Sequence, residues 1–282
     1  MKKKWIIDNF FNEKGYQENI TRQLNLCGLD IFVSPYIRFV KEDFKLPERF
    51  IIDEPVFAYG TIQFIQDLTK KYKNVIAFYS DKEFNLTEYL PKMPLALFLN
   101  GDNVFTTFGL LKKQPEKYFS LFNDNKLFIR PNSGSKTFTG QVINYNSLFE
   151  ELNGLEKTSG VSDNTLISVS KCYDIKNEYR FIIVGNKVLT GSQYLENKEL
   201  KMDSTYPIEA FNVAQKIAEL PEENKPDPIA FVCDVAELNN GDFKVVELNS
   251  FSCSDFYQSD IKKAFVGITN YINKKYMEEI YE

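Results

Sequence analysis

The chain has 282 residues, of which 43 % are hydrophobic and 15 % aromatic, so it is long enough for two domains and can build a sizeable core. Its formal net charge of −5 argues against the basic surface that binds duplex nucleic acid, and no apolar stretch approaches the roughly 18 residues of a membrane-spanning helix. The chain contains no histidine, which excludes Ser-His-Asp and Cys-His catalysis and leaves carboxylates, Lys, Arg, Tyr, Ser, Cys or a metal ion for any chemistry, as in phosphoryl transfer.

The first part of the chain, up to about residue 115, has the pattern of a small α/β domain. Apolar periodicity predicts helices over 17–26 and 62–72, and strands over 29–33, 49–52, 55–58 and 74–79. The lysines at 2–4 are expected to form a solvated terminus. Gly60 and Thr61 join a strand to a helix, an arrangement that can bind phosphate but more often reflects ordinary packing. Proline and glycine punctuation places a domain boundary near residues 110–120.

After a predicted helix over 115–122, a strand over 126–130 leads into a small, polar loop over 131–140 that contains Lys136. Such a loop offers backbone N–H groups and a cation to a chain of phosphates, although it lacks the Walker A pattern. A plain surface loop has the same composition, so the loop alone does not decide between the two. A further strand is predicted over 165–170.

The segment 178–194 reads as a hairpin with a two-residue turn at 185–186. Glu178 and Arg180 are two residues apart, so their side chains share one face. A regular ladder would place Gln193 and Gly191 opposite them, and a glycine opposite Arg180 would leave room there for a ligand. The alternative is an exposed ion pair of little energetic value.

The segment 229–249 predicts a second hairpin, because Asn240 and Gly241 form the strongest short turn signal between two strands. With a two-residue turn at that point, Asp234 lies opposite Glu247, and Asn249 points the same way. Two carboxylates face to face destabilise a sheet, and a divalent cation would offset that cost. Two carboxylates and an amide oxygen suit Mg²⁺ or Mn²⁺. The alternative is two solvated charges on a hairpin whose register has slipped by one residue.

The chain's four cysteines form no Cys-x-x-Cys pair and fit no zinc site. We expect reduced, mostly buried thiols in a cytoplasmic protein.

Taken in chain order, these pieces resemble the ATP-grasp superfamily over about residues 120–260. The similarity is greatest to the branch with one characteristic arginine and two basic positions, which includes relatives of the eukaryotic cell-division-cycle factor that assembles translation initiation factor two. The resemblance implies two α+β subdomains that sandwich a nucleotide, after a small α/β domain. The expected limits are 1–115 for the N-terminal domain and 116–282 for the ATP-grasp domain, with a lid subdomain at 116–165 and a metal-binding subdomain at 166–282.

The resemblance also implies a role for each residue of the motifs. Arg130 would contact the α-phosphate, and Lys136 would cover the phosphates from its loop. The hinge strand beside adenine would be formed by Ser168, Val169 and Ser170, and Glu178 would bind the ribose. Arg180 would lie near the γ-phosphate and the reacting carboxylate, and the metal would be held by Asp234, Glu247 and Asn249. Lys126 and Lys171 are alternatives for the basic roles.

The implied function is an ATP- and Mg²⁺-dependent carboxylate–amine ligase that acts through an acyl phosphate, with Arg180, Arg130 and Lys136 neutralising the transferred phosphoryl group. Its partners would be ATP, a carboxylate donor and an amine acceptor, each a small molecule, a peptide or a protein. Cys253 and Tyr257 are expected on the acceptor side. An ATP-binding assembly chaperone or protein-binding module without ligase turnover is the first alternative, and a metal-dependent nuclease or phosphotransferase is the second.

Overall fold

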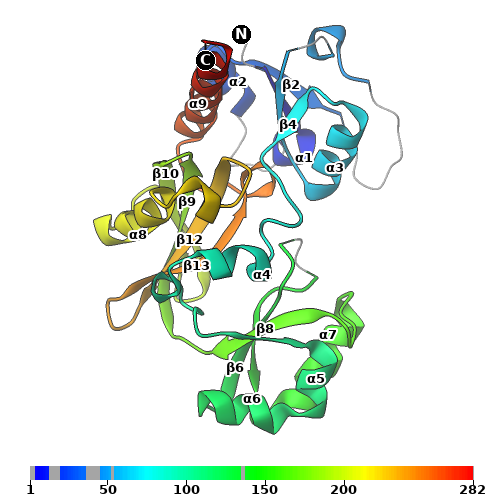
Figure 1. Ribbon diagram of the computed structural model, residues 1–282, viewed down its shortest axis with the longest axis vertical. Helices are drawn as coiled ribbons and strands as arrows, with labels where there is room; N and C mark the ends of the chain where they lie inside the picture. The colour runs from blue at the N-terminus through cyan, green and yellow to red at the C-terminus, as the bar shows by residue number, and fades with distance from the viewer. Residues whose placement is uncertain (1–3, 13–19, 36–44, 52–53, 135–136, 282) are drawn as a thin grey trace.

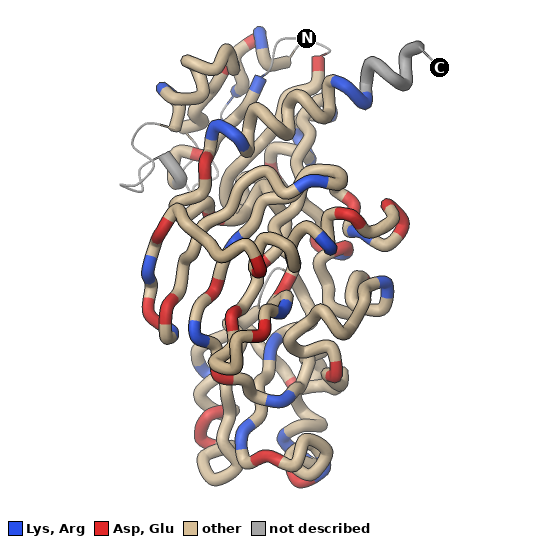
Figure 2. Tube along the Cα trace, turned by 90° about the vertical axis from the view of Figure 1, so that its left-hand side faces the viewer, with Lys and Arg blue, Asp and Glu red and all other residues tan. Residues whose placement is uncertain are grey.

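The computed structural model describes residues 4–12, 20–35, 45–51, 54–134 and 137–281. They form three sheets that follow one another along the long axis of the molecule (Figure 1). We call them the N-terminal sheet, the core sheet in the middle and the lid sheet at the opposite end. Acidic and basic residues are interspersed over all three parts (Figure 2). No helix in the described part of the chain is long and apolar enough to cross a membrane.

The N-terminal sheet is parallel, with the strand order β2-β1-β3-β4. Its strands are β1 (Lys4–Asp8), β2 (Asp30–Ser34), β3 (Val56–Tyr59) and β4 (Val75–Ala77), and its helices are α1 (Asn9–Asn12), α2 (Ile20–Leu26), the 3₁₀ helix η1 (Glu48–Phe50) and α3 (Ile62–Lys71). Most predicted elements are confirmed, but the strand predicted over 49–52 is wrong, because η1 lies there. The prediction of a solvated terminus is also wrong for Lys4, which is only 5 % exposed and forms an ion pair with Glu54 at 3.0 Å.

The lid sheet is antiparallel, with the order β5-β8-β6-β7. Its strands are β5 (Val104–Thr107), β6 (Lys126–Pro131), β7 (Gln141–Asn144) and β8 (Leu166–Lys171), and its helices are α5 (Phe108–Lys113), α6 (Pro115–Phe122), the 3₁₀ helix η4 (Tyr145–Ser147) and α7 (Leu148–Thr158). Since β5 pairs with β8, this sheet extends beyond both limits, 116 and 165, that the sequence suggests for the lid.

The core sheet is also antiparallel, with the order β11-β10-β9-β12-β13. Its strands are β9 (Ile175–Val184), β10 (Lys187–Glu196), β11 (Glu199–Asp203), β12 (Ala230–Leu238) and β13 (Phe243–Ser250), joined by α8 (Ile208–Ala218) and the 3₁₀ helix η5 (Glu222–Asn224). Side chains alternate along β9, so that Phe181 and Ile183 pack with α8, whereas Ile182 and Val184 face the opposite side.

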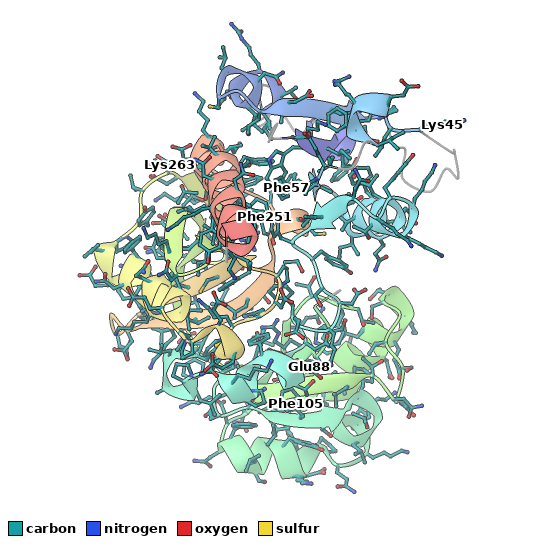
Figure 3. The ribbon with its side chains drawn as sticks, turned by 45° about the horizontal axis from the view of Figure 1, so that its top comes forward. Lys45, Phe57, Glu88, Phe105, Phe251 and Lys263 are labelled. Carbon is teal, nitrogen blue, oxygen red and sulfur yellow. The ribbon has the colours of Figure 1, made fainter. Side chains whose placement is uncertain are left out.

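That opposite side joins the core sheet to the N-terminal sheet. The 3₁₀ helix η6 (Phe251–Cys253) and the long helix α9 (Ile261–Tyr281) follow β13 and pack between the two. The ring centroids of Trp5 and Phe265 lie 4.3 Å apart, and Trp5 Nε1 donates a hydrogen bond to Thr269 Oγ1 at 3.0 Å. Phe57 and Phe251 lie close to α9 in the same cluster (Figure 3). The two sheets therefore share one hydrophobic core.

A connector over residues 78–103 runs from the N-terminal sheet to the lid (Figure 1). It contains α4 (Leu86–Tyr89) and the 3₁₀ helices η2 (Leu90–Lys92) and η3 (Leu95–Leu97). The Leu99 N–H donates to the Val245 carbonyl at 2.8 Å, and the Leu86 N–H donates to the Asn132 carbonyl at 3.0 Å. The connector thus touches the edge of the core sheet and the start of the loop between β6 and β7, residues 132–140, which we call the lid loop.

Candidate active site

The hairpin β12–β13 places the two predicted metal carboxylates opposite each other, but not through the predicted turn. Leu238 and Asp242 close a three-residue loop, in which Gly241 has a φ of +87°. Such a loop by itself would put Val246 opposite Asp234. A β-bulge at Val246 adds one residue to β13, so that Val235 pairs with Val245 and Asp234 pairs with Glu247. The pairing is confirmed, whereas the two-residue turn is wrong.

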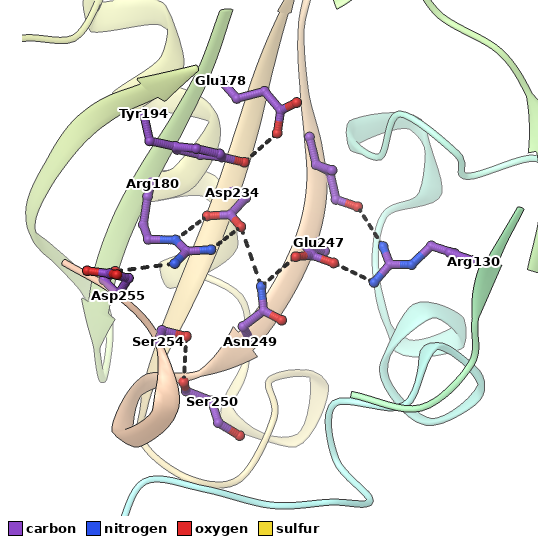
Figure 4. A network of polar contacts seen from close by, with 11 residues as sticks. Arg130, Glu178, Arg180, Tyr194, Asp234, Glu247, Asn249, Ser250, Ser254 and Asp255 are labelled. Atoms are coloured by element: carbon purple, nitrogen blue, oxygen red, sulfur yellow. Dashed lines mark hydrogen bonds and ion pairs between the residues drawn. The ribbon is translucent and has the colours of Figure 1, made fainter. Parts of the chain in front are cut away.

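The bulge also decides which face Glu247 occupies. Val245 and Leu248 both pack into the core beneath α8. In a regular strand without a bulge, Glu247 would lie two residues after Val245 and so point to that same apolar face. With it, Glu247 and Asn249 point to the face of Asp234, as Figure 4 shows.

Asp234 is bound by Arg180 in a bidentate ion pair. Arg180 Nε donates to Asp234 Oδ1 and Nη2 donates to Oδ2, both at 2.8 Å, and Nη1 donates to the Asp255 carbonyl at 3.2 Å (Figure 4). Both partners are buried, at 9 % and 1 % side-chain exposure. Burial alone would lower the pKa of the Arg180 guanidinium, but the charge of Asp234 and the hydrogen bonds to it, together with Tyr257 and Tyr194, raise this pKa well above its ordinary value. Arg180 therefore stays protonated.

The partner predicted opposite Arg180 is wrong. A bulge around Leu189 shifts the β9–β10 ladder by one residue, so that Arg180 faces Ser192 and Gly191 faces Phe181. A Cβ at Gly191 would come within 2.4 Å of the Phe181 ring, so this glycine serves packing rather than a ligand. The ladder slips because a turn fixes register only as far as the first bulge.

Two aromatic rings cover Arg180. Tyr194 and Tyr257 stack with ring centroids 4.8 Å apart and 8° between their planes. The Arg180 Cζ atom lies 5.4 Å from the Tyr194 centroid and 5.0 Å from that of Tyr257, within the range of cation–π attraction. Tyr257 has a φ of +48°, which is rare for a residue with a side chain. Neither contact was predicted from the sequence.

Glu178 is linked to this arrangement through Tyr194, whose hydroxyl donates to its carboxylate. Burial raises the pKa of Glu178, and the nearby charges of Asp234 and Glu247 raise it further against the hydrogen bond from Tyr194. Three carboxylates therefore share one electrostatic neighbourhood.

Arg130 brings the lid to the core sheet. Its Nη2 lies 2.5 Å from Glu247 Oε2, and its Nη1 donates to the carbonyl of the bulged Val246 at 3.4 Å. Burial would lower the pKa of Arg130, but the charge and hydrogen bond of Glu247, together with Tyr89 and Asp234, raise this pKa overall. Tyr89 of the connector is buried beside this pair, and burial raises its pKa to about 12, with the Glu247 charge adding to the effect. The position of Tyr89 beside this pair was not predicted from the sequence.

The predicted metal ligands converge. Asn249 Nδ2 lies 2.9 Å from Glu247 Oε1 and 3.4 Å from Asp234 Oδ2. Each carboxylate has about four lone-pair positions, so the arginines leave positions for a metal. The described residues contain no metal-sized cluster of three His, Cys, Asp or Glu side chains, because the third donor is an amide. Oxygen donors of this kind fit Mg²⁺.

A cavity of about 400 Å³ lies between the lid and the core sheet, and Arg130, Glu178 and Glu247 all line it. The predicted hinge residues lie in β8 but do not line it: Val169 packs in the lid core, and Ser168 and Ser170 are buried. The wall is formed by the next residues along the chain, Lys171, Cys172 and Tyr173. Lys171, one of the two alternative basic residues, is thus placed at the cavity, and Lys126 is not among its lining residues.

A second cavity, of about 290 Å³, lies on the other side of the polar network. Arg180 and Asn249 line it, together with Cys253 and Tyr257, which the sequence placed on the acceptor side. Gly134 of the lid loop reaches this cavity, whereas Lys136 lies outside the described residues. The network of arginines and carboxylates is therefore a wall shared by two cavities.

The sequence of the lid and the core sheet matches a known protein family. The model of a family described as "ATP-grasp domain, R2K clade family 2" matches residues 115–265, just over half of the chain. This chain belongs to the ATP-grasp family. No curated protein sequence matches it.

Solved structures of ATP-grasp proteins share the fold over nearly the whole chain. The VanG D-Ala:D-Ser ligase from Enterococcus faecalis is 12 % identical, with a TM-score of 0.59 over 95 % of this chain and 100 % of that one. An N5-carboxyaminoimidazole synthase from Aspergillus clavatus, in complex with ADP and an aminoimidazole ribonucleotide, is 13 % identical, with a TM-score of 0.61 over 95 % and 77 %. The ATP-grasp ligase PsnB, solved with a precursor variant, Mg and ADP, is 12 % identical, with a TM-score of 0.53 over 95 % and 99 %. The fold predicted from the sequence is confirmed.

Proposed function

We propose that the protein is an ATP- and Mg²⁺-dependent carboxylate–amine ligase that releases ADP through an acyl-phosphate intermediate. The observation that carries this proposal is the shared wall: Arg130, Glu178 and Glu247 face one cavity, and Arg180 and Asn249 face the other. A ligase of this kind needs a nucleotide on one side and its substrates on the other, with the transferred phosphoryl group between them.

The larger cavity is assigned to ATP. Glu178 would accept hydrogen bonds from ribose hydroxyls, and Arg130 and Lys171 would bind phosphate oxygens. Asp234, Glu247 and Asn249 would hold Mg²⁺, which neutralises phosphate charge when it is bound. Lys136 remains a proposed phosphate contact from its loop.

Arg180 is assigned to the reacting centre. Its guanidinium is held by Asp234, the Asp255 carbonyl and two rings, so it stands at a fixed position in the wall. There it would neutralise the oxygens of the transferred group as a donor carboxylate attacks the γ-phosphorus. An amine would then attack the acyl carbon and displace phosphate. None of these steps needs a protein nucleophile, in keeping with the absence of histidine.

The first test is thermal stabilisation by ATP or a non-hydrolysable analogue, with and without Mg²⁺. A ligand at 100 times its dissociation constant stabilises a protein by about 2.7 kcal/mol. Wild type should show this shift only partly without Mg²⁺, and Glu247→Gln should lose the Mg²⁺-dependent part. Glu199→Gln, on the exposed strand β11, is the matched control and should behave as wild type.

The second test is ADP release with a panel of carboxylates and amines. Release that needs both substrates supports the ligase. A nucleotide shift without any such release would favour an ATP-binding assembly factor, and no shift with any nucleotide would overturn the proposal.

A further inference from the structure

The second cavity is bordered by segments that lie far apart in the sequence. It lies where the start of α3, the connector, the lid loop and the segment after β13 meet. The lining residues are Ile62, Tyr79, Ser80, Phe84, Gly134, Arg180, Asn249, Ser250, Cys253, Ser254, Asp255 and Tyr257. At about 290 Å³ it is at the lower limit of ligand pockets, which suits a molecule of amino-acid size.

Among the described residues, the charges around this cavity are mostly negative. Among its described lining residues, Arg180 is the one cation, and its charge is matched by Asp234. Asp255 lines the cavity directly, and Asp81 is hydrogen-bonded to the hydroxyl of Tyr79, another lining residue. Burial raises the pKa of the Cys253 thiol, and the charges of Asp81 and Asp8 raise it further. A cation is therefore favoured in this space.

Asp255 is fixed relative to the reacting centre. Its carbonyl accepts the hydrogen bond from Arg180 Nη1 at 3.2 Å, and its Oδ1 accepts one from the Tyr257 N–H at 3.3 Å. The residue thus joins the arginine of the wall to the ring that covers it. A group bound at the Asp255 carboxylate would lie within the same cavity as the Arg180 guanidinium.

We propose that this cavity takes the amine substrate, a small primary amine of amino-acid size, and that Asp255 binds its ammonium group and accepts a proton from it. The proposal rests on the ligase function proposed above. The ammonium group loses one proton to the Asp255 carboxylate, and its nitrogen lone pair then forms the C–N bond. The C–O bond to phosphate breaks, phosphate leaves with that electron pair, and the second proton of the nitrogen goes to the departing phosphate.

The other lining residues indicate which substituents this amine can carry. Hydroxyl groups of Ser80, Ser250 and Ser254 favour polar substituents, and Ile62 and Phe84 offer room for a short hydrocarbon part. Ethanolamine, glycine, alanine and serine are therefore the probes of choice.

The test compares these amines with hydroxylamine, a nucleophile that is uncharged at neutral pH and needs no partner for an ammonium group. ADP release with Mg-ATP and a carboxylate panel is measured for wild type, Asp255→Asn and Asp255→Glu. Asp227→Asn, an exposed aspartate in the loop before β12, is the control. Loss of one charge-assisted hydrogen bond, roughly 1.5–3 kcal/mol, predicts that Asp255→Asn raises the half-saturating concentration of the amine about 10- to 100-fold. Its hydroxylamine-dependent release should change far less, and Asp255→Glu should recover part of the amine effect.

The outcomes separate the two proposals. Equal losses with amines and with hydroxylamine in Asp255→Asn, or no loss with either, would overturn the role of Asp255 while leaving the ligase intact. Absence of any nucleotide-induced stabilisation of the wild type would overturn the ligase and this assignment together. Nucleotide-induced stabilisation of Asp255→Asn serves as the check that this variant is folded.

Discussion

Two arginine–carboxylate pairs lie side by side in this protein and are built differently. Arg180 and Asp234 come from neighbouring strands of one sheet, make two hydrogen bonds of 2.8 Å and are covered by Tyr194 and Tyr257. Arg130 and Glu247 come from different subdomains and make one contact, with 12 % and 13 % of their side chains exposed.

The first pair also supports the fold of one sheet, whereas the second pair bridges two subdomains. The first pair is fixed by the register of the core sheet, in which Arg180 and Asp234 lie opposite each other on neighbouring strands. The second pair exists only where the lid meets the core sheet, and it borders the larger cavity. Removing a partner should therefore cost stability at the first pair and nucleotide affinity at the second.

The largest effect is expected from Arg180→Met. It leaves the Asp234 carboxylate buried without its counter-charge, a loss of about 3–5 kcal/mol. Urea unfolding would measure this loss in the free energy of unfolding. The double variant Arg180→Met/Asp234→Leu should regain most of the stability and yet show no ADP release. A single variant as stable as wild type would refute the architectural role.

Arg130→Ala should have a smaller effect on stability and a clear one on nucleotide binding. Loss of a charge-assisted contact to phosphate should raise the dissociation constant for ATP 10- to 100-fold, which corresponds to a loss of about 1.5–3 kcal/mol in binding free energy. Arg130→Lys keeps the charge but loses the forked geometry, so its affinity for ATP should lie between that of wild type and that of Arg130→Ala. Titration calorimetry with a non-hydrolysable analogue measures this order. Unchanged affinity in Arg130→Ala would remove Arg130 from the nucleotide site.

Substitutions of Tyr257 test the cover over the first pair. Tyr257→Phe keeps the stack on Tyr194 and the ring over Arg180, so its free energy of unfolding should match that of wild type. Tyr257→Ala removes both contacts and should lose about 1 kcal/mol. Equal losses in the two variants would show that the hydroxyl, rather than the ring, carries the effect.

The smallest effect concerns pH. Burial, followed by the charges of Asp234 and Glu247, raises the pKa of Glu178 above its ordinary value of 4.5. The folded protein then holds this proton more tightly than the unfolded chain, so its stability falls as the pH rises above 4.5 through the raised pKa. Relative to wild type, Glu178→Gln should gain stability between pH 4 and pH 7 in metal-free urea unfolding. A difference that stays constant over this range would contradict the shift.

The sequence predicted the fold and the order of the motifs because strand, turn and charge patterns are local. It was less reliable on register. The Gly185-Asn186 turn is as predicted, yet the pairing of Arg180 is not, since a bulge lies between them. At the second hairpin the turn is one residue longer and a bulge restores the pairing of Asp234 with Glu247. The apolar residues at 243, 245 and 248 break the period of two that a regular strand would show, and this break was the signal in the sequence for a bulge.

Other parts of the site depend on contacts distant in sequence. Nothing near Arg130 indicates that it meets Glu247, which is 117 residues away. The buried strand β1 was missed because three lysines precede its apolar core, although Lys4 pairs with Glu54. The cavity wall at 171–173 follows directly after the predicted hinge at 168–170, and this offset of three residues lies within the usual uncertainty of element boundaries.

The bulge at Val246 has a consequence for mutagenesis. Its carbonyl accepts a hydrogen bond from the lid arginine, and that oxygen belongs to the main chain. Replacing the valine by any other amino acid keeps the acceptor, so alanine scanning would pass over it. Deleting the residue is the informative experiment: the ladder would close, Glu247 would stay opposite Asp234, and only the acceptor would be gone. The lid arginine is therefore bound both by the Glu247 side chain and by one extra peptide unit, and side-chain substitution can test only the first of these contacts.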